Sequence, residues 1–152
     1  APEQCFDAVV AALKDLADQA AEHDLIIGVE NEHACNIATA AESAKLHNAL
    51  PHPNLKLVWD PANALVSGEN PYPGGYGLLP KDRIVHVHAK DCHMEGHQPH
   101  WGPVGTRDVE GVSRGDERRV LRAVRGRETG VAGPVTLGPT GLHHGRGGEA
   151  DE

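Results

Sequence analysis

The sequence predicts an α/β fold in which helices cover a parallel sheet. Helical stretches alternate with short apolar runs, and these runs end near residues 30, 60, 88 and 137. Two of the intervals are close to the roughly 30 residues of a βαβ unit, and such alternation is typical of a parallel sheet. An open doubly wound sheet and part of a (β/α)8 barrel both fit. No G-x-G-x-x-G motif follows a predicted strand, so a dinucleotide-binding sheet would lack its phosphate loop.

Three stretches have the residue pattern of helices. Residues 3–22 place apolar side chains at the i, i+3, i+4, i+7 spacing of one buried stripe. Residues 40–50 look helical and stop before Pro51, because a residue that precedes proline disfavours helical backbone. Residues 116–124 predict a basic helix with its apolar residues on one side.

Four apolar runs predict strands, and the first of them suits a strand covered on both faces. We expect a long polar loop over residues 92–115, one domain over residues 1–137, and a poorly ordered Gly/His/acidic tail over residues 138–152. The predicted strands are residues 25–29, 55–59, 84–87 and 135–137.

Charge and cysteine content exclude several classes of function. The net charge of −8 opposes a nucleic-acid partner and an anionic membrane surface. We expect no membrane span, because no stretch reaches roughly 18 consecutive apolar residues, and no secretory leader, because the sequence shows no basic stretch followed by an apolar one. Cys5, Cys35 and Cys92 form no C-x-x-C pair, so we expect a reduced, cytoplasmic protein. Because the chain begins Ala-Pro and its only methionine is Met94, we also expect a fragment.

Each of the first three strands ends in a residue type that binds divalent metals. These residues are Glu30, Asp60 and His88. The carboxyl ends of parallel strands lie on one side of a sheet, so the three side chains are expected to converge. Two carboxylates and an imidazole suit Mn²⁺, Mg²⁺, Co²⁺ or Zn²⁺. The alternative is structural: acids after strands often cap the next helix.

Three motifs carry a family resemblance. Residues 29–33 (VENEH), 58–61 (VWDP) and 86–91 (HVHAKD) occur in this order and at this spacing. Together they resemble the xylose isomerase-like TIM-barrel family, in its sugar isomerase and epimerase branch, over roughly residues 5–110. A closed barrel needs roughly 250 residues. The resemblance therefore implies the C-terminal half of a (β/α)8 barrel, with about four parallel strands and outer helices.

The resemblance also implies a site. One divalent metal would be held at the ends of barrel strands 5 to 8, with Glu30, Asp60 and His88 as the first three ligands. His88 is preferred to His86 because the family's ligand precedes an x-Lys-Asp step, as His88 does. Alternation along the strand points both imidazoles the same way. The implied contacts to substrate are His33, Asn63, His86 and Lys90.

The sequence departs from the family at the fourth ligand. A glutamate is expected after the last strand, but Gly138 stands there, and Glu149 or His143 would have to replace it from the tail. Many relatives carry a histidine where this chain has Asn63, which is a poor metal ligand and disfavours a multi-zinc nuclease site. The fourth strand therefore supplies no expected ligand, and Glu30 is the remaining candidate base.

Three histidines cluster in the expected loop after the third strand. His93 and His97 have the i, i+4 spacing of a zinc pair on a helix, and His100 follows. Gly96 and Pro99 oppose a helix at this point, which favours a solvated loop facing the substrate.

The implied reaction is isomerisation or epimerisation of a sugar or sugar phosphate. The metal would stabilise an enediolate while Glu30 transfers a proton. Two alternatives remain: a non-catalytic half-barrel that binds metal or sugar weakly, which Gly138 favours, and an unrelated parallel α/β binding domain. Half a barrel has two unpaired sheet edges, so we expect pairing with another half or a homodimer.

Overall fold

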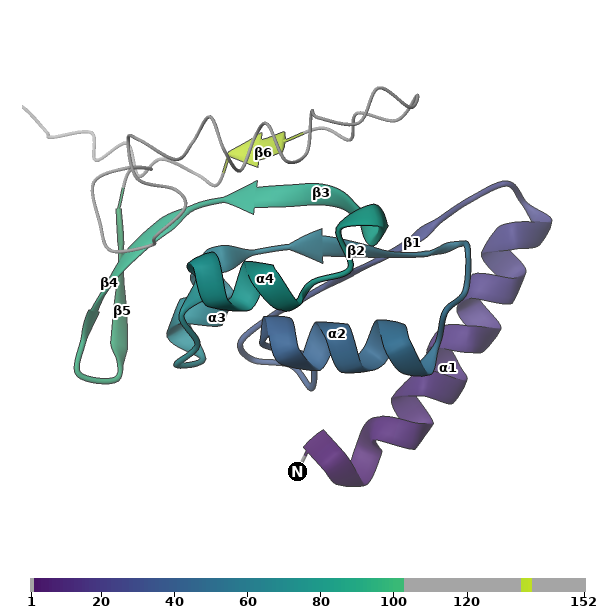
Figure 1. Cartoon of the computed structure of the whole chain (residues 1–152), viewed down its shortest axis with the longest axis horizontal. Helices are drawn as coiled ribbons and strands as arrows, with labels where there is room; N and C mark the ends of the chain where they lie inside the picture. The colour runs from purple at the N-terminus through teal and green to yellow at the C-terminus, as the bar shows by residue number, and fades with distance from the viewer. Residues whose placement is uncertain (1, 103–134, 138–152) are drawn as a thin grey trace, which may run out of the picture.

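Four parallel strands form the central sheet of the computed structural model, which describes residues 2–102 and 135–137. Their order is β1-β2-β3-β6, so consecutive strands are neighbours (Figure 1). The positions predicted for the strands are confirmed, and those of β2 and β6 match residue for residue. The strands are β1 (Ile27–Glu30), β2 (Leu55–Trp59), β3 (Ile84–Ala89) and β6 (Val135–Leu137).

Helices connect the strands, and the first two agree with the sequence. The predicted helix at residues 116–124 lies outside the described residues. No helix among the described residues is long and apolar enough to cross a membrane. The helical segments are α1 (Pro2–Glu22), α2 (Ala40–Ala49), α3 (Pro61–Val66), the short turns η1 (Pro71–Gly75) and η2 (Lys81–Arg83), and α4 (Tyr76–Leu78).

The described helices lie on one face of the sheet, as Figure 1 shows. Along β2, Leu55, Leu57 and Trp59 are buried, while Lys56 and Val58 between them are half-buried. The first set faces the helices, since successive strand residues point to opposite faces. A doubly wound sheet carries helices on both faces, whereas a barrel carries them outside only. The arrangement therefore favours the barrel among the two architectures that the pattern allowed.

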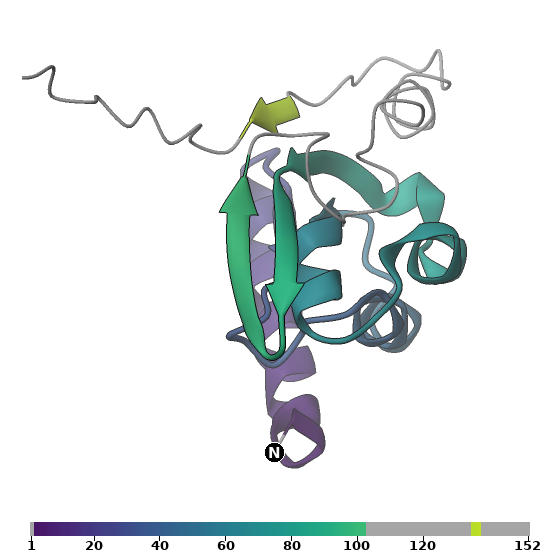
Figure 2. The same ribbon diagram turned by 90° about the vertical axis from the view of Figure 1, so that its left-hand side faces the viewer.

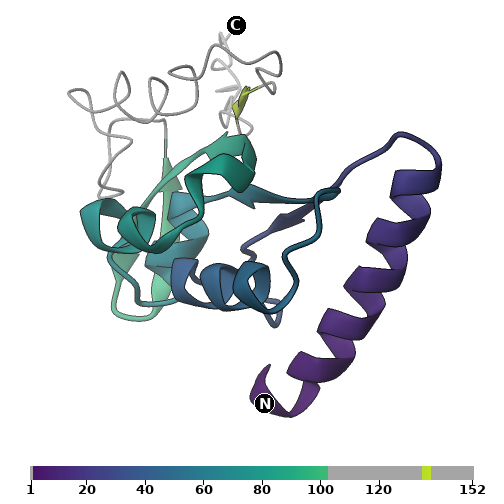
Figure 3. The same cartoon turned by 45° about the vertical axis from the view of Figure 1, so that its right-hand side comes forward.

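Two apolar clusters join the helices to this face. Helix α1 packs near the β1 edge, where Ala17 meets Leu50 and Leu55. Figure 3 shows α1 set apart from the other helices, and Leu25 and Ile26, just before β1, are 60% and 49% exposed. The β1 edge is thus open in the described part of the chain. The larger cluster comprises Ala40, Leu57, Trp59, Ala64, Leu79 and Val87.

Helix α2 begins at a capping box. The Thr39 hydroxyl accepts a hydrogen bond from the Glu42 backbone N–H, and the Glu42 carboxylate accepts one from the Thr39 N–H. The Glu69 carboxylate accepts two more, from the N–H groups of Ala40 and Ala41. These bonds satisfy the donors that a helix start leaves unpaired.

The prediction of a polar loop from residue 92 is wrong for the part that the structure describes. Strands β4 (Asp91–Glu95) and β5 (Gln98–Gly102) form an antiparallel hairpin, which lies in front of the sheet in Figure 2. Its two-residue turn begins at Gly96, whose φ of 62° suits the first central position of a tight hairpin turn. Cys92 anchors the hairpin by packing against Ala62 of α3. This segment is ordered by individual residues such as Cys92 and Gly96. It has no continuous apolar run, which is the pattern that predicts a buried strand from the sequence.

Candidate metal centre

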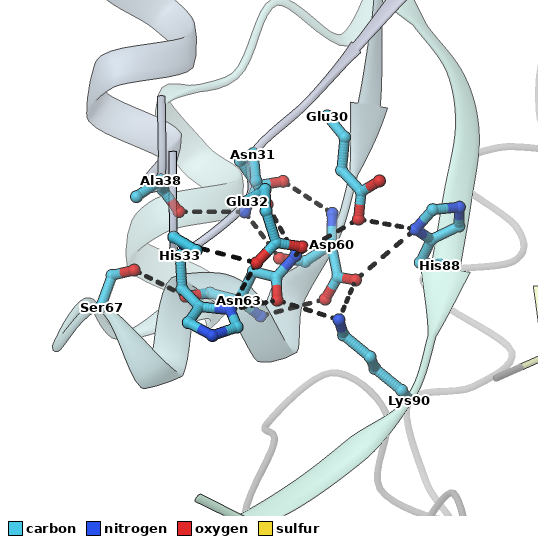
Figure 4. A network of polar contacts seen from close by, with 11 residues as sticks. Glu30, Asn31, Glu32, His33, Ala38, Asp60, Asn63, Ser67, His88 and Lys90 are labelled. Atoms are coloured by element: carbon cyan, nitrogen blue, oxygen red, sulfur yellow. Dashed lines mark hydrogen bonds and ion pairs between the residues drawn. The ribbon is translucent and has the colours of Figure 1, made fainter. Parts of the chain in front are cut away.

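The ends of β1, β2 and β3 bring Glu30, Asp60 and His88 together. One ligand atom from each lies within 4.8 Å of the others. His88 Nδ1 is 2.8 Å from Glu30 Oε1 and 3.6 Å from Asp60 Oδ2 (Figure 4). Glu30 and His88 alternate with Val29 and Val87, which pack toward the helices, and Asp60 follows the last residue of β2. The convergence expected from parallel strand ends is therefore present.

Asp60 serves both as a helix cap and as part of this group. Its Oδ1 accepts a hydrogen bond of 3.0 Å from the Asn63 N–H at the start of α3. Its Oδ2 faces His88 and the ammonium group of Lys90, the latter at 2.9 Å. Burial raises the pKa of Asp60, and the Asn63 N–H and the Lys90 ammonium oppose that rise. The structural and the ligand interpretations of this aspartate are thus compatible.

Asn31 holds the end of β1 against the end of β2. Its side-chain nitrogen donates to the Asp60 carbonyl at 2.7 Å, and its side-chain oxygen accepts from the Asp60 N–H at 2.8 Å. Asn31 is fully buried. This pair of bonds fixes the backbone that carries two of the candidate ligands. Sequence reasoning assigned Asn31 no role, and its place directly after Glu30 was the only signal.

Asn63 lies at the centre of the polar network in Figure 4. Its amide nitrogen donates to the Asn31 carbonyl at 2.8 Å and lies 3.2 Å from carboxylate oxygens of Glu30 and Glu32. Its amide oxygen is 2.9 Å from Lys90 Nζ and 3.1 Å from His33 Nδ1. Asn63 is fully buried. Asn63 is therefore connected to the surface of the site through the side chains that it contacts.

Three further candidates surround the group. His33 Nδ1 lies 2.6 Å from Glu32 Oε1. Lys90 is also 5.0 Å from the centre of the Trp101 ring, in a cation–π contact. The His86 ring meets His88 edge-on at 5.1 Å, as strand alternation predicts. Burial lowers the pKa of His86, and His88 lowers it further.

The donor set fits one divalent ion. Asp60 Oδ2 is buried, lies 2.9 Å from the Lys90 ammonium and faces His88 Nδ1 at 3.6 Å. Two carboxylates and one imidazole offer the mixed O/N ligands that Mn²⁺, Co²⁺ and Zn²⁺ accept. Gly138, His143 and Glu149, the positions considered for a fourth ligand, lie outside the described residues.

Comparison with known proteins agrees with this geometry. The family model described as xylose isomerase-like TIM barrel matches residues 1–144. This chain belongs to that family. Its sheet is accordingly part of a (β/α)8 barrel, as the resemblance in the motifs implied. A comparison with the curated proteins finds no match.

Two solved structures share the barrel fold. One is the probable 3-DHS dehydratase AsbF of Bacillus anthracis, with 18% identity, a TM-score of 0.70, and coverage of 93% of this chain and 53% of that chain. The other is the IOLI protein, solved with a binding zinc atom, with 18% identity, a TM-score of 0.64, and coverage of 90% of this chain and 48% of that chain. The chain thus spans about half the length of these members of the fold.

Proposed function

We propose that this chain carries the metal-binding part of a divalent-metal-dependent sugar or sugar-phosphate isomerase or epimerase. The supporting observation is the convergence of Glu30, Asp60 and His88 within 4.8 Å. These residues lie at the carboxyl ends of the strands, the face on which active sites of barrel enzymes are found. Family membership and the zinc atom in the IOLI structure support a metal at this position.

Glu30 is proposed as the proton-transfer group. A bound ion supplies a Lewis acid for the oxygens of a keto or aldo sugar. The contacts of Glu30 with His88 and Asn63 both use Oε1, which leaves Oε2 to take a proton from the carbon next to the carbonyl. Return of that proton to the neighbouring carbon, with a proton moved from the hydroxyl to the carbonyl oxygen, gives isomerisation, whereas epimerisation needs a second group to deliver a proton to the opposite face.

The surrounding cations and imidazoles are proposed to hold the substrate. Lys90, His33 and His86 are each partly exposed next to the triad, so they can donate hydrogen bonds to sugar hydroxyls or to a phosphate. We assign Asn63 to substrate binding through His33 and Lys90, because its own amide is buried and bonded to both.

Metal binding is tested by calorimetric titration of the chain with Mn²⁺. Asp60→Asn keeps a side chain that can cap α3 and removes one charged ligand, so it is expected to weaken Mn²⁺ binding at least about 100-fold. Glu22→Gln, at the exposed end of α1, is the control and should bind Mn²⁺ as the unchanged chain does. Equal affinity of the Asp60→Asn variant would end the case for this centre.

Proton transfer is tested separately. The Mn²⁺-loaded chain is incubated with a panel of keto-sugars in deuterated water, and deuterium incorporation is followed by NMR. Incorporation that Glu30→Gln abolishes and Glu22→Gln preserves supports the proposed reaction. Incorporation that survives Glu30→Gln contradicts the role of Glu30.

A second candidate is a half-barrel that binds metal or sugar weakly without turnover. Gly138, which stands where the family's fourth ligand is expected, favours it. Mn²⁺ binding without deuterium incorporation for any sugar of the panel would support this candidate over the enzyme.

Self-association is proposed through the open sheet edge. Leu25 and Ile26 are exposed beside β1, and an unpaired edge strand is a template for pairing. Sedimentation velocity should show a dimer that Ile26→Lys dissociates. A monomer at all accessible concentrations would contradict the pairing.

A further inference from the structure

A second set of metal-binding side chains lies on the β4–β5 hairpin. His93 and His100 are directly opposite each other in its ladder, and Glu95 is two residues from His93, so it shares the same face. The three side chains are exposed. The opposite face includes Cys92, which is buried against α3. The hairpin, which lies in front of the sheet in Figure 2, therefore has an imidazole pair and a carboxylate on its exposed face.

The spacing on this face suits one ion. Side chains directly opposite in an antiparallel pair have Cβ atoms about 4.5–5.5 Å apart, close enough for two imidazoles to reach one zinc at about 2.0–2.1 Å. The Glu95 carboxylate already lies 3.2 Å from His100 Nε2. The exposed His93 imidazole would have to turn toward this pair for all three groups to reach one ion.

We propose that His93, His100 and Glu95 bind Zn²⁺ or a similar ion such as Ni²⁺, at a site separate from Glu30, Asp60 and His88. Two histidines and one glutamate form a known zinc ligand set that leaves a position for water. Imidazole-rich sites favour Zn²⁺, Ni²⁺ and Cu²⁺ over Mn²⁺ and Mg²⁺. The two centres would therefore differ in the metal they prefer.

The tertiary structure changes which histidines are paired. The sequence spacing suggested His93 with His97, as on a helix. In the hairpin, His97 follows Gly96 in the turn, and the residue across from His93 is His100. An ion bound to His93 and His100 would tie β4 to β5 and so hold Trp101 of β5 beside Lys90.

The test compares zinc binding in three versions of the full chain by calorimetry. His93→Ala with His100→Ala is expected to bind one equivalent of Zn²⁺ fewer than the unchanged chain. His97→Ala is the matched control and should keep that equivalent. The proposal would be overturned if the double variant bound as many equivalents of Zn²⁺ as the unchanged chain, or if the His97→Ala control also lost one equivalent. Far-UV circular dichroism confirms that each variant is folded.

Two further measurements separate this site from the first one. Glu95→Gln should weaken binding of the hairpin zinc about 10-fold or more and leave Mn²⁺ binding unchanged. Zinc should slow amide hydrogen exchange in β4 and β5 of the unchanged chain, and this slowing should be absent from the double variant. Slowing that persists in the double variant would place the zinc elsewhere. Both results are independent of whether Glu30, Asp60 and His88 support a reaction.

Discussion

Acid is expected to destabilise the fold through His47, a residue of α2 whose imidazole is buried. The residue is 5% exposed, and neither ring nitrogen has a hydrogen-bond partner among the described residues. Burial lowers the pKa of His47 from 6.5 to about 4; Arg83 and Lys56 contribute to that fall, and Asp82 opposes it. Protonating the folded chain would therefore place a charge with no hydrogen-bond partner among the described residues at a buried position.

The sign and size of the effect follow from these two values. Above pH 6.5 His47 is neutral in both states, so it adds no pH dependence. Between pH 6.5 and about 4 the unfolded chain binds the proton and the folded chain does not, so stability falls as the pH falls. At 1.36 kcal/mol per pKa unit, the loss is about 2 kcal/mol at about pH 5 and at most about 3 kcal/mol below about pH 4.

His47→Leu removes the titrating group and fills the same buried space. Urea unfolding followed by circular dichroism at about pH 7.5 and about pH 5 should show the unchanged chain losing about 2 kcal/mol more than this variant. Groups such as Asp60 and His86 are common to both proteins and cancel in the difference. His97→Leu makes the same substitution at an exposed position and serves as the control. An equal loss in the His47→Leu variant and the unchanged chain would refute the role of burial.

Three further substitutions test the hydrogen bonds of Asn31 at the metal centre, the capping box of α2 and the core cluster around Leu57. Asn31→Ala removes both hydrogen bonds to the Asp60 backbone; urea unfolding should show a loss of about 2–3 kcal/mol, and calorimetry should show weaker Mn²⁺ binding by about 10-fold. If the Asn31→Ala variant is destabilised but binds Mn²⁺ normally, the hydrogen bonds of Asn31 do not position Asp60 for metal binding. Thr39→Ala breaks the capping box of α2 and should cost about 1 kcal/mol in the same unfolding assay, whereas Thr39→Ser should cost little. Leu57→Ala opens a cavity under α2 and should cost about 2–5 kcal/mol; a loss below about 1 kcal/mol would show that the cluster around Leu57 is not close-packed.

The sequence alone was sufficient for the four strands of the central sheet and for the three candidate ligands. Strand character is local, because a short apolar run bounded by polar residues predicts its own limits, as in β2 and β6. The direction of parallel strands then places every carboxyl end on one side. Glu30, Asp60 and His88 could thus be brought together without coordinates, and their separation of at most 4.8 Å agrees.

Other features depended on contacts between distant parts of the chain. Asn31 and Asp60 are 29 residues apart, and Asn63 and Glu30 are 33 residues apart. No local pattern therefore reveals the hydrogen bonds of Asn31 to the Asp60 backbone or the buried contacts of Asn63. The alternation of strands and helices left the barrel and the doubly wound sheet both open; the motif resemblance chose the barrel, and the face that the helices cover agrees with that choice. On the hairpin, a two-residue turn at Gly96 decides that His93 faces His100 and not His97. Local periodicity determines which segments are strands, whereas the pairing and burial of polar side chains are decided only when those segments pack.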